Sequence, residues 1–179
     1  MTESRFPPAD ASPPGRRVLV AVVTGSVGDQ IQAWRKQHDP EQARRLPPHT
    51  TLCYWAPELS AELDAQVRHA FHTPIRVQLG GVREFDNRDR TFFIEVLDTA
   101  DLDAARDRLY DATYLTLEGN RPWTWHVTCI RYGARRDLAS VRELVGSLTV
   151  NAPWNVDRVA LLELRGNVYV TLQEWRLDG

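Results

Sequence analysis

The sequence predicts an α+β protein of two pseudo-symmetric lobes, each a mainly antiparallel sheet backed by helices, with a central cleft between them. Two observations carry this prediction. The order strand, helix, histidine-bearing strand, helix, strand occurs twice along the chain. The strings His49-Thr50-Thr51-Leu52 and His126-Val127-Thr128-Cys129, 77 residues apart, occupy equivalent places in the two copies. A duplicated unit of this kind puts equivalent strands in two lobes that face one cleft.

The first copy opens with the apolar run Val-Leu-Val-Ala-Val-Val inside residues 17–24, a composition typical of a buried strand. In the following helix we expect Ser26 as the N-cap, with Ile31 and Trp34 three positions apart on one face. The complete set expected here is a strand at 17–24, a helix after Ser26, a strand at 49–55, a helix near 60–72 and an extended stretch at 75–85.

The second copy follows the same order, and its first helix carries Leu102, Ala105 and Leu109 on one stripe. Its expected elements are a strand at 91–97, a helix near 101–112, a strand at 125–132, a helix near 137–148 and an extended stretch at 154–164. Beyond the repeat, Gly166-Asn167 between two strand-like runs predicts a hairpin, because glycine readily supplies positive φ. We expect this hairpin to give one lobe an extra strand.

The two strings predict catalytic chemistry. Side chains alternate along a strand, so each His and the Thr two positions later share one face. Two such pairs, His49 with Thr51 and His126 with Thr128, supply a general acid, a general base and two hydroxyls for a phosphate, which is enough to break a phosphodiester without a metal. The alternative is that each His is an ordinary core or edge residue of a Thr-containing strand, and spacing alone does not decide between the two.

Further residues are candidates for substrate binding. Phe85, Trp125 and Tyr132 are aromatic and lie near strand ends, where they would stack a base or simply pack the core. Strict alternation places Arg131 opposite His126 unless the strand twists or ends near Ile130. A regular first strand would also put Cys53 on the cleft face beside His49 and Thr51.

Proline-bearing, extended segments, residues 45–48 and 121–125, lead into both strings. With these approaches, the two strings and the repeat, the chain resembles the two-histidine phosphoesterase superfamily, in particular its bacterial 2′-5′ RNA ligase-like branch, over about residues 17–178. The resemblance implies RNA 2′,3′-cyclic phosphodiesterase activity, with His49 as acid, His126 as base and a 2′-phosphate as product. It also extends the second motif to Arg131. Two departures, Cys53-Tyr54-Trp55 after the first motif and Trp125 in place of a proline, concern substrate preference.

Composition limits the remaining choices. With 179 residues and a formal net charge of −2, we expect one bilobal domain at 17–179 after a disordered lead-in at 1–16, and no broad basic surface for long duplexes. The expected partners are RNA termini or small cyclic nucleotides. No apolar run suits a signal peptide or membrane span, so we expect a cytoplasmic protein. The near-zero net charge allows a monomer or a weak dimer, and we expect the monomer. Cys53 and Cys129 are expected as reduced thiols, and no ligand spacing indicates a metal or other cofactor.

Two alternatives to the cyclic phosphodiesterase stay open at this point. The same site would serve a 2′-5′ RNA ligase or an enzyme acting on another cyclic phosphate, such as that of ADP-ribose. A non-catalytic nucleotide-binding module would keep the cleft without turnover. The intact His and Thr of both motifs argue against that last reading.

Overall fold

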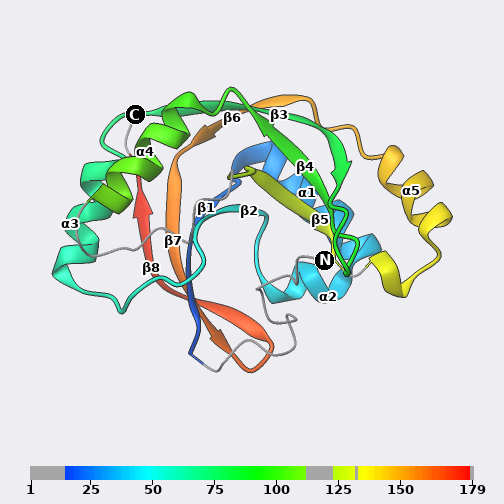
Figure 1. The fold of residues 1–179 in the computed structure, drawn as a ribbon, viewed down its shortest axis with the longest axis horizontal. Coiled ribbons are helices and arrows are strands. Elements are labelled where there is room, and N and C mark those ends of the chain that lie inside the picture. Colours follow the sequence, from blue (N-terminus) through cyan, green and yellow to red (C-terminus); the bar gives the residue numbers. More distant parts are fainter. Residues whose placement is uncertain (1–14, 112–122, 132, 178–179) are drawn as a thin grey trace.

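The structure is a computed structural model that describes residues 15–111, 123–131 and 133–177, and the lead-in expected at 1–16 lies almost wholly outside them. Within the described residues, eight strands form two four-stranded sheets (Figure 1). The strands are β1 Arg17–Val22, β2 His49–Cys53, β3 Ile75–Glu84, β4 Phe92–Leu97, β5 His126–Ile130, β6 Ala152–Val156, β7 Arg158–Arg165 and β8 Val168–Arg176. The helices are α1 Gly25–His38, α2 Pro40–Arg45, α3 Ala61–Ala70, α4 Ala100–Asp111 and α5 Leu138–Gly146, with a short 3₁₀ turn, η2, at Gly133–Arg135.

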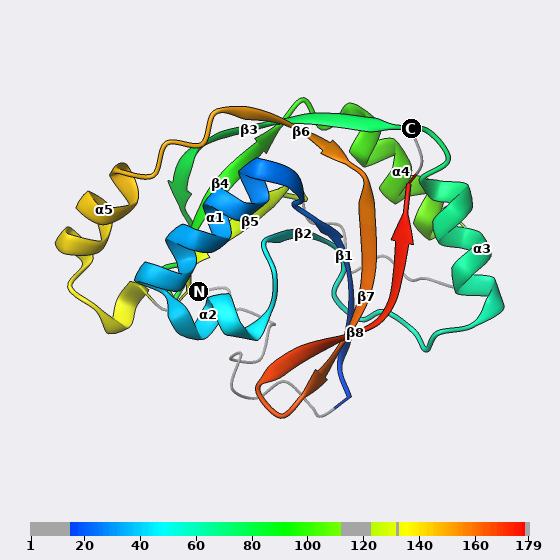
Figure 2. The ribbon, with the colours of Figure 1, turned by 180° about the vertical axis from the view of Figure 1, so that it is seen from behind.

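Sheet A has the strand order β2-β1-β7-β8 and sheet B the order β5-β4-β3-β6. Every neighbouring pair is antiparallel. Helices α3 and α4 lie together at one side of the curved sheets, while α1, α2 and α5 lie at the other side (Figures 1 and 2). The predicted α+β class with two antiparallel, helix-backed lobes is therefore confirmed.

The connectivity differs from the simple repeat. The extended stretch that closes the first copy, β3, does not join the sheet of β1 and β2 but pairs with β4 and β6 in sheet B. The C-terminal hairpin of β7 and β8, which turns at Gly166 with φ 62°, provides the other two strands of sheet A. The predicted hairpin is confirmed, and its second strand, β8, adds to sheet A. Both sheets nevertheless have four strands, because the stretch expected at 154–164 is divided between β6 of sheet B and β7 of sheet A.

One local prediction is also corrected. The N-cap residue of α1 is Thr24, two residues before the expected Ser26. The segment expected to be extended before the first motif, residues 45–48, begins at the last residue of the short helix α2 and is extended from Leu46 onward. Asp39 caps α2, with Pro40 at its first position. Proline favours that place because its missing N–H has no partner there in any helix.

The main hydrophobic core joins both sheets to the helices, and buried members such as Leu19, Ile31 and Val127 come from three different elements. Two buried tryptophans fasten the helices to it. The indole Nε1–H of Trp125 donates to Asp103 of α4, and that of Trp175 donates to Asp64 of α3, both at 2.7 Å. A buried indole N–H without an acceptor would destabilise the fold, so these bonds fix where α3 and α4 lie. No helix in the described part of the chain is long and apolar enough to cross a membrane.

Candidate active site

The two histidine-bearing strands lie side by side at the junction of the sheets. Strand β2 is the edge of sheet A, β5 is the edge of sheet B, and the two strands contact each other (Figure 2). Just past the end of β5, the backbone N–H of Arg131 donates to Asp39, on the approach to β2, at 3.0 Å. Just past the end of β2, the Tyr54 ring lies 5.6 Å from that of Trp123, on the approach to β5. The strands therefore run in opposite directions, and the start of each lies near the end of the other.

The two imidazoles are held in the same way. His49 Nδ1 donates to the carbonyl of Pro47 at 2.7 Å, and His126 Nδ1 donates to the carbonyl of Thr124 at 2.8 Å. Because a carbonyl can only accept, Nδ1 carries the hydrogen and the neutral ring keeps its lone pair on Nε2. In each motif the acceptor lies two residues before the histidine, on the extended approach segment. Both rings consequently present Nε2 for proton transfer.

Each threonine shares a face with its histidine. The register with the neighbouring strand runs without a break from His49 to Thr51, opposite Val22 to Val20, and from His126 to Thr128, opposite Glu95 to Phe93. Regular alternation therefore holds over both His-x-Thr strings. The residue between them points the other way, as shown by Val127, which is fully buried in the main core.

Both strands lose this regularity one residue after the threonine. Thr51 pairs with Val20, but Cys53 already pairs with the next residue, Leu19; likewise Thr128 pairs with Phe93 and Ile130 with Phe92. An extra residue in the same place of both strands is a β-bulge, which bends the strand and resets its alternation. Both motif strands therefore have a bulge at the same position relative to the His-x-Thr string.

The bulges change the faces expected after each motif. Cys53 does not line the cleft but is buried with Leu19 in the main core. Arg131, expected opposite His126 by strict alternation, lies beyond the end of β5 and after the bulge, on the face of the histidines. Its positive charge acts on both rings and lowers the pKa of His49 and of His126. Arg131 is thus brought to both histidines.

The rings lie in a setting that disfavours their protonation. Burial lowers the pKa of His49 from 6.5 to about 4. The charges of Arg35, His126 and Arg131 lower this pKa further, whereas the hydrogen bond to the Pro47 carbonyl raises it. Burial and Arg131 also lower the pKa of His126, opposed by the Thr124 carbonyl. The charge of His126 also acts on His49, so the two rings lie within electrostatic reach of each other.

Two residues that sequence reasoning missed support this arrangement. Arg35, 1% exposed, donates from Nη2 to the carbonyls of Gln42 (2.8 Å) and Leu46 (3.0 Å), directly before the Pro47 carbonyl that holds His49. Burial lowers the pKa of Arg35 to about 10, so it stays charged at neutral pH. Asp39 joins α2 to Arg131. The Asp-Pro pair at 39–40 was a readable helix-cap signal, whereas nothing local marks Arg35 as buried.

The aromatic candidates separate into three cases. Phe85 and Phe93 stack at 4.0 Å and lie edge-on to the His126 ring at 5.0 and 5.4 Å, so they border the site. Trp125 is 4% exposed, packs in the main core and donates to Asp103 of α4, so we leave it out of the proposed site. Tyr132 lies outside the described residues.

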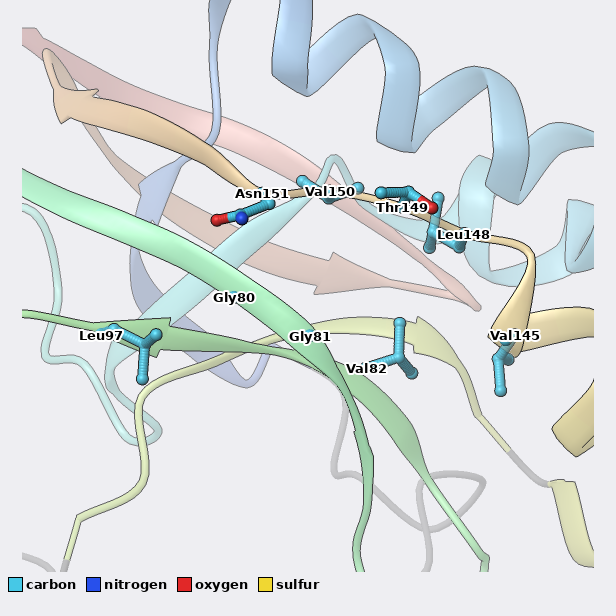
Figure 3. A pocket seen from close by; sticks show the side chains of 10 residues that line it. Gly80, Gly81, Val82, Leu97, Val145, Leu148, Thr149, Val150 and Asn151 are labelled. Atoms are coloured by element: carbon cyan, nitrogen blue, oxygen red, sulfur yellow. The ribbon is translucent and has the colours of Figure 1, made fainter.

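A separate hollow of about 570 Å³ lies on sheet B (Figure 3). The bulged glycines Gly80 and Gly81, Leu97 and the segment from Val145 to Asn151 line it, and none of its lining residues belongs to β2 or β5. Its polar side chains are Thr149 and Asn151, which offer no acid, base or nucleophile activated for catalysis. Among the described residues, no group of three or more His, Cys, Asp or Glu side chains is arranged to hold a metal ion.

An antiparallel pair of edge strands, each presenting an imidazole and a hydroxyl on one face, defines the class of two-histidine phosphoesterases. The chain belongs to the 2′-5′ RNA ligase superfamily, whose family model matches residues 24–168. A comparison with curated proteins finds no match.

Solved structures support the same fold. A crystal structure described only as a phosphoesterase is 20% identical and has a TM-score of 0.58, covering 93% of this chain and 100% of its own. Escherichia coli LigT in its apo form is 20% identical with a TM-score of 0.54, covering 94% and 100%. LigT complexed with 3′-AMP is 21% identical with a TM-score of 0.53, covering 93% and 100%. These identities are low, so the likeness establishes the fold, while the family match makes phosphoester chemistry the class of activity.

Proposed function

We propose that this protein is a metal-independent phosphodiesterase that hydrolyses 2′,3′-cyclic phosphates, on RNA ends or nucleotides, to 2′-phosphates. The observation that carries the proposal is the matched pair of imidazoles, each fixed through Nδ1 by a carbonyl two residues earlier and each followed by a threonine on its own face. His49, Thr51, His126 and Thr128 are the proposed catalytic residues.

In the proposed reaction the hydroxyls of Thr51 and Thr128 donate to the non-bridging phosphate oxygens, and Arg131 offsets their negative charge. The neutral imidazole takes a proton from water at Nε2 as the water oxygen attacks phosphorus. The protonated imidazole donates its Nε2 proton to the ribose 3′ oxygen as the P–O bond to that oxygen breaks. The product retains the phosphate on the 2′ oxygen, and the two rings have exchanged protonation states.

The roles follow the family resemblance, with His49 as acid and His126 as base. Both rings are mainly neutral in the empty site at neutral pH, because burial lowers both pKa values. The acid must therefore gain its proton together with the substrate, whose negative phosphate raises the pKa of a nearby imidazole. This assignment predicts that inorganic phosphate raises the pKa of His49 more than that of His126, measured by NMR titration. The reverse order would exchange the two roles.

The proposed substrates are RNA termini or small cyclic nucleotides. Escherichia coli LigT has been solved with 3′-AMP, phosphate and ATP, which fits a cleft of this family that accepts nucleotides and phosphate. Arg131 and Phe85 are the proposed substrate-binding residues, because one brings positive charge and the other an aromatic ring to His126. Cys53 and Cys129 are buried and are not joined in a disulfide, consistent with a reducing cytoplasm.

The test is hydrolysis of the four nucleoside 2′,3′-cyclic monophosphates and of a short RNA ending in the cyclic phosphate, with EDTA present. We expect turnover that resists EDTA, yields a 2′-phosphate by ³¹P NMR and falls by on the order of 10²- to 10⁴-fold in His49→Ala and in His126→Ala. His69→Ala is the matched control, since His69 is exposed on α3 and outside the motifs. Turnover of no substrate by the folded wild-type protein would refute the proposal.

A further inference from the structure

Two arginines and three aromatic side chains beside the start of β5 form a row, with a cation at each end, which we call the aromatic patch: Arg16, Tyr54, Trp55, Arg106 and Trp123. The Arg16 guanidinium lies over the Trp55 ring at 4.5 Å and over the Tyr54 ring at 5.9 Å. Tyr54 and Trp123 have ring centroids 5.6 Å apart, and the Arg106 guanidinium lies over Trp123 at 3.8 Å. The row is thus continuous from Arg16 to Arg106.

The patch borders the proposed site. Trp123 lies three residues before His126, on the segment whose Thr124 carbonyl holds the imidazole. Tyr54 directly follows the bulge at the end of β2, in the place that Arg131 occupies after β5. Since the two strands are antiparallel, the end of β2 and the start of β5 meet at one end of the cleft. A chain leaving the phosphate site toward that end would pass over the patch.

Trp55 is the feature that packing does not explain. Its side chain is 47% exposed, although burying an indole is among the most favourable contributions a side chain can make to folding. Trp55 lies in a bend immediately after β2, and the Arg16 guanidinium packs over its ring. The Nε of Arg16 also donates to the Tyr54 carbonyl at 3.3 Å. An exposed aromatic ring beside arginines is an arrangement with which proteins bind single-stranded nucleic acids, since bases stack on the ring and phosphates contact the cations.

We propose that the aromatic patch binds the bases of single-stranded RNA leading to the terminal cyclic phosphate, so that the enzyme prefers RNA ends over cyclic mononucleotides. The inference rests on the proposed function for its catalytic readout and names the substrate class. Charge complementarity supports RNA as the occupant, because the guanidinium groups of Arg16 and Arg106 bring positive charge to the aromatic rings. A duplex would require a broader basic surface.

The first test compares kcat/KM for cytidine 2′,3′-cyclic monophosphate with that for a pentaribonucleotide ending in the cyclic phosphate. In Trp55→Ala we expect a loss of roughly ten-fold for the pentanucleotide and no change for the mononucleotide, as for removal of one stacked base. Trp55→Phe should retain most of the activity on the pentanucleotide. Leu59→Ala is the matched control, because Leu59 is 46% exposed only four residues away and lies outside the patch. Equal losses on both substrates, or no loss on either, would overturn the proposal.

The second test measures binding without turnover, by fluorescence anisotropy of a labelled pentaribonucleotide carrying a terminal 2′-phosphate. Trp55→Ala and Arg16→Gln should each weaken binding several-fold, while Leu59→Ala should not. Wild-type protein that binds this RNA through Trp55 but hydrolyses no cyclic phosphate would refute the proposed function and support the patch. If the protein hydrolyses both substrates but binds the RNA equally well without Trp55 or Arg16, the role of the aromatic patch is refuted and the proposed function stands.

Discussion

Asp39 offers the sharpest test of how the two motif strands are held together. Its carboxylate is only 5% exposed; one oxygen accepts from the Gln42 N–H at 3.3 Å and the other from the Arg131 N–H at 3.0 Å. The first bond caps α2, which leads to His49, and the second fixes the residue that follows β5. One side chain thereby sets the position of Arg131 relative to both histidines.

Replacing Asp39 by alanine removes a helix cap, worth about 1 kcal/mol, and leaves the Arg131 N–H without its acceptor, worth about 1–3 kcal/mol. We expect the free energy of unfolding to fall by roughly 2–4 kcal/mol in urea denaturation. Activity should fall as well, by on the order of ten-fold in kcat/KM, because the Arg131 guanidinium is no longer held toward the phosphate.

The control is Asp137→Ala, which removes a similar carboxylate cap, the 3.1 Å bond to the Ser140 N–H of α5, but no contact with the site. It should cost about 1 kcal/mol of stability and leave kcat/KM unchanged. A double-mutant cycle with Arg131→Met decides the mechanism, because an effect carried through Arg131 disappears once Arg131 is gone. The reasoning fails if Asp39→Ala lowers kcat/KM as much in the Arg131→Met background as in the wild type, or if its activity matches that of Asp137→Ala.

Three further predictions concern the histidines and threonines. Because the pKa of His49 falls from 6.5 to about 4 on folding, the unfolded chain binds more protons between these values, so stability is full above pH 6.5 and is lost as the pH drops toward 4. His49 changes the free energy of unfolding by about 3 kcal/mol at most over this pH range. In urea titrations of His49→Gln, the free energy of unfolding should therefore depend less steeply on pH than in the wild type. An unchanged pH dependence contradicts the burial argument. Arg35→Met removes a positive charge that acts on His49, so the pKa of His49 should rise in an NMR titration, and a constant or lower pKa would exclude that charge effect. Thr51→Val and Thr128→Val should each lower kcat by on the order of 10- to 10²-fold with little change in KM. Thr50 is 1% exposed on the opposite face of β2, so Thr50→Val should leave kcat unchanged. A similar loss of kcat in Thr50→Val would point to a general effect of strand packing.

The features predictable from the sequence are those set by neighbouring residues. The alternation that puts His49 with Thr51, and His126 with Thr128, needs only two consecutive steps of one strand. The hairpin at Gly166 is likewise a local choice of backbone conformation. The partner of β3 is not local: its composition fits either sheet, and only the packing of the whole chain places it beside β4.

The same limit explains the errors at the site. A bulge is a relation between two strands, so the sequence of β2 alone does not reveal that Cys53 turns into the core. Arg35 sits on α1 directly before the exposed Lys36, and its burial depends on carbonyls of α2 and of the segment after it. Asp39 is readable as a helix cap, but its second bond reaches Arg131, 92 positions away.

The proposed reaction gives two different tasks to the two copies of the repeated unit. Both copies hold an imidazole through Nδ1 and bulge after the threonine, so duplication by itself supplies two equivalent rings. The proposed acid-base hydrolysis needs the rings in opposite protonation states, and the differences lie around the repeated parts. The buried charge of Arg35 acts on His49, whereas Phe85 and Phe93 enclose His126. Five residues after each histidine, the equivalent positions hold Tyr54 in one copy and Arg131 in the other, so the aromatic patch lies at one end of the two strands and Arg131 at the opposite end.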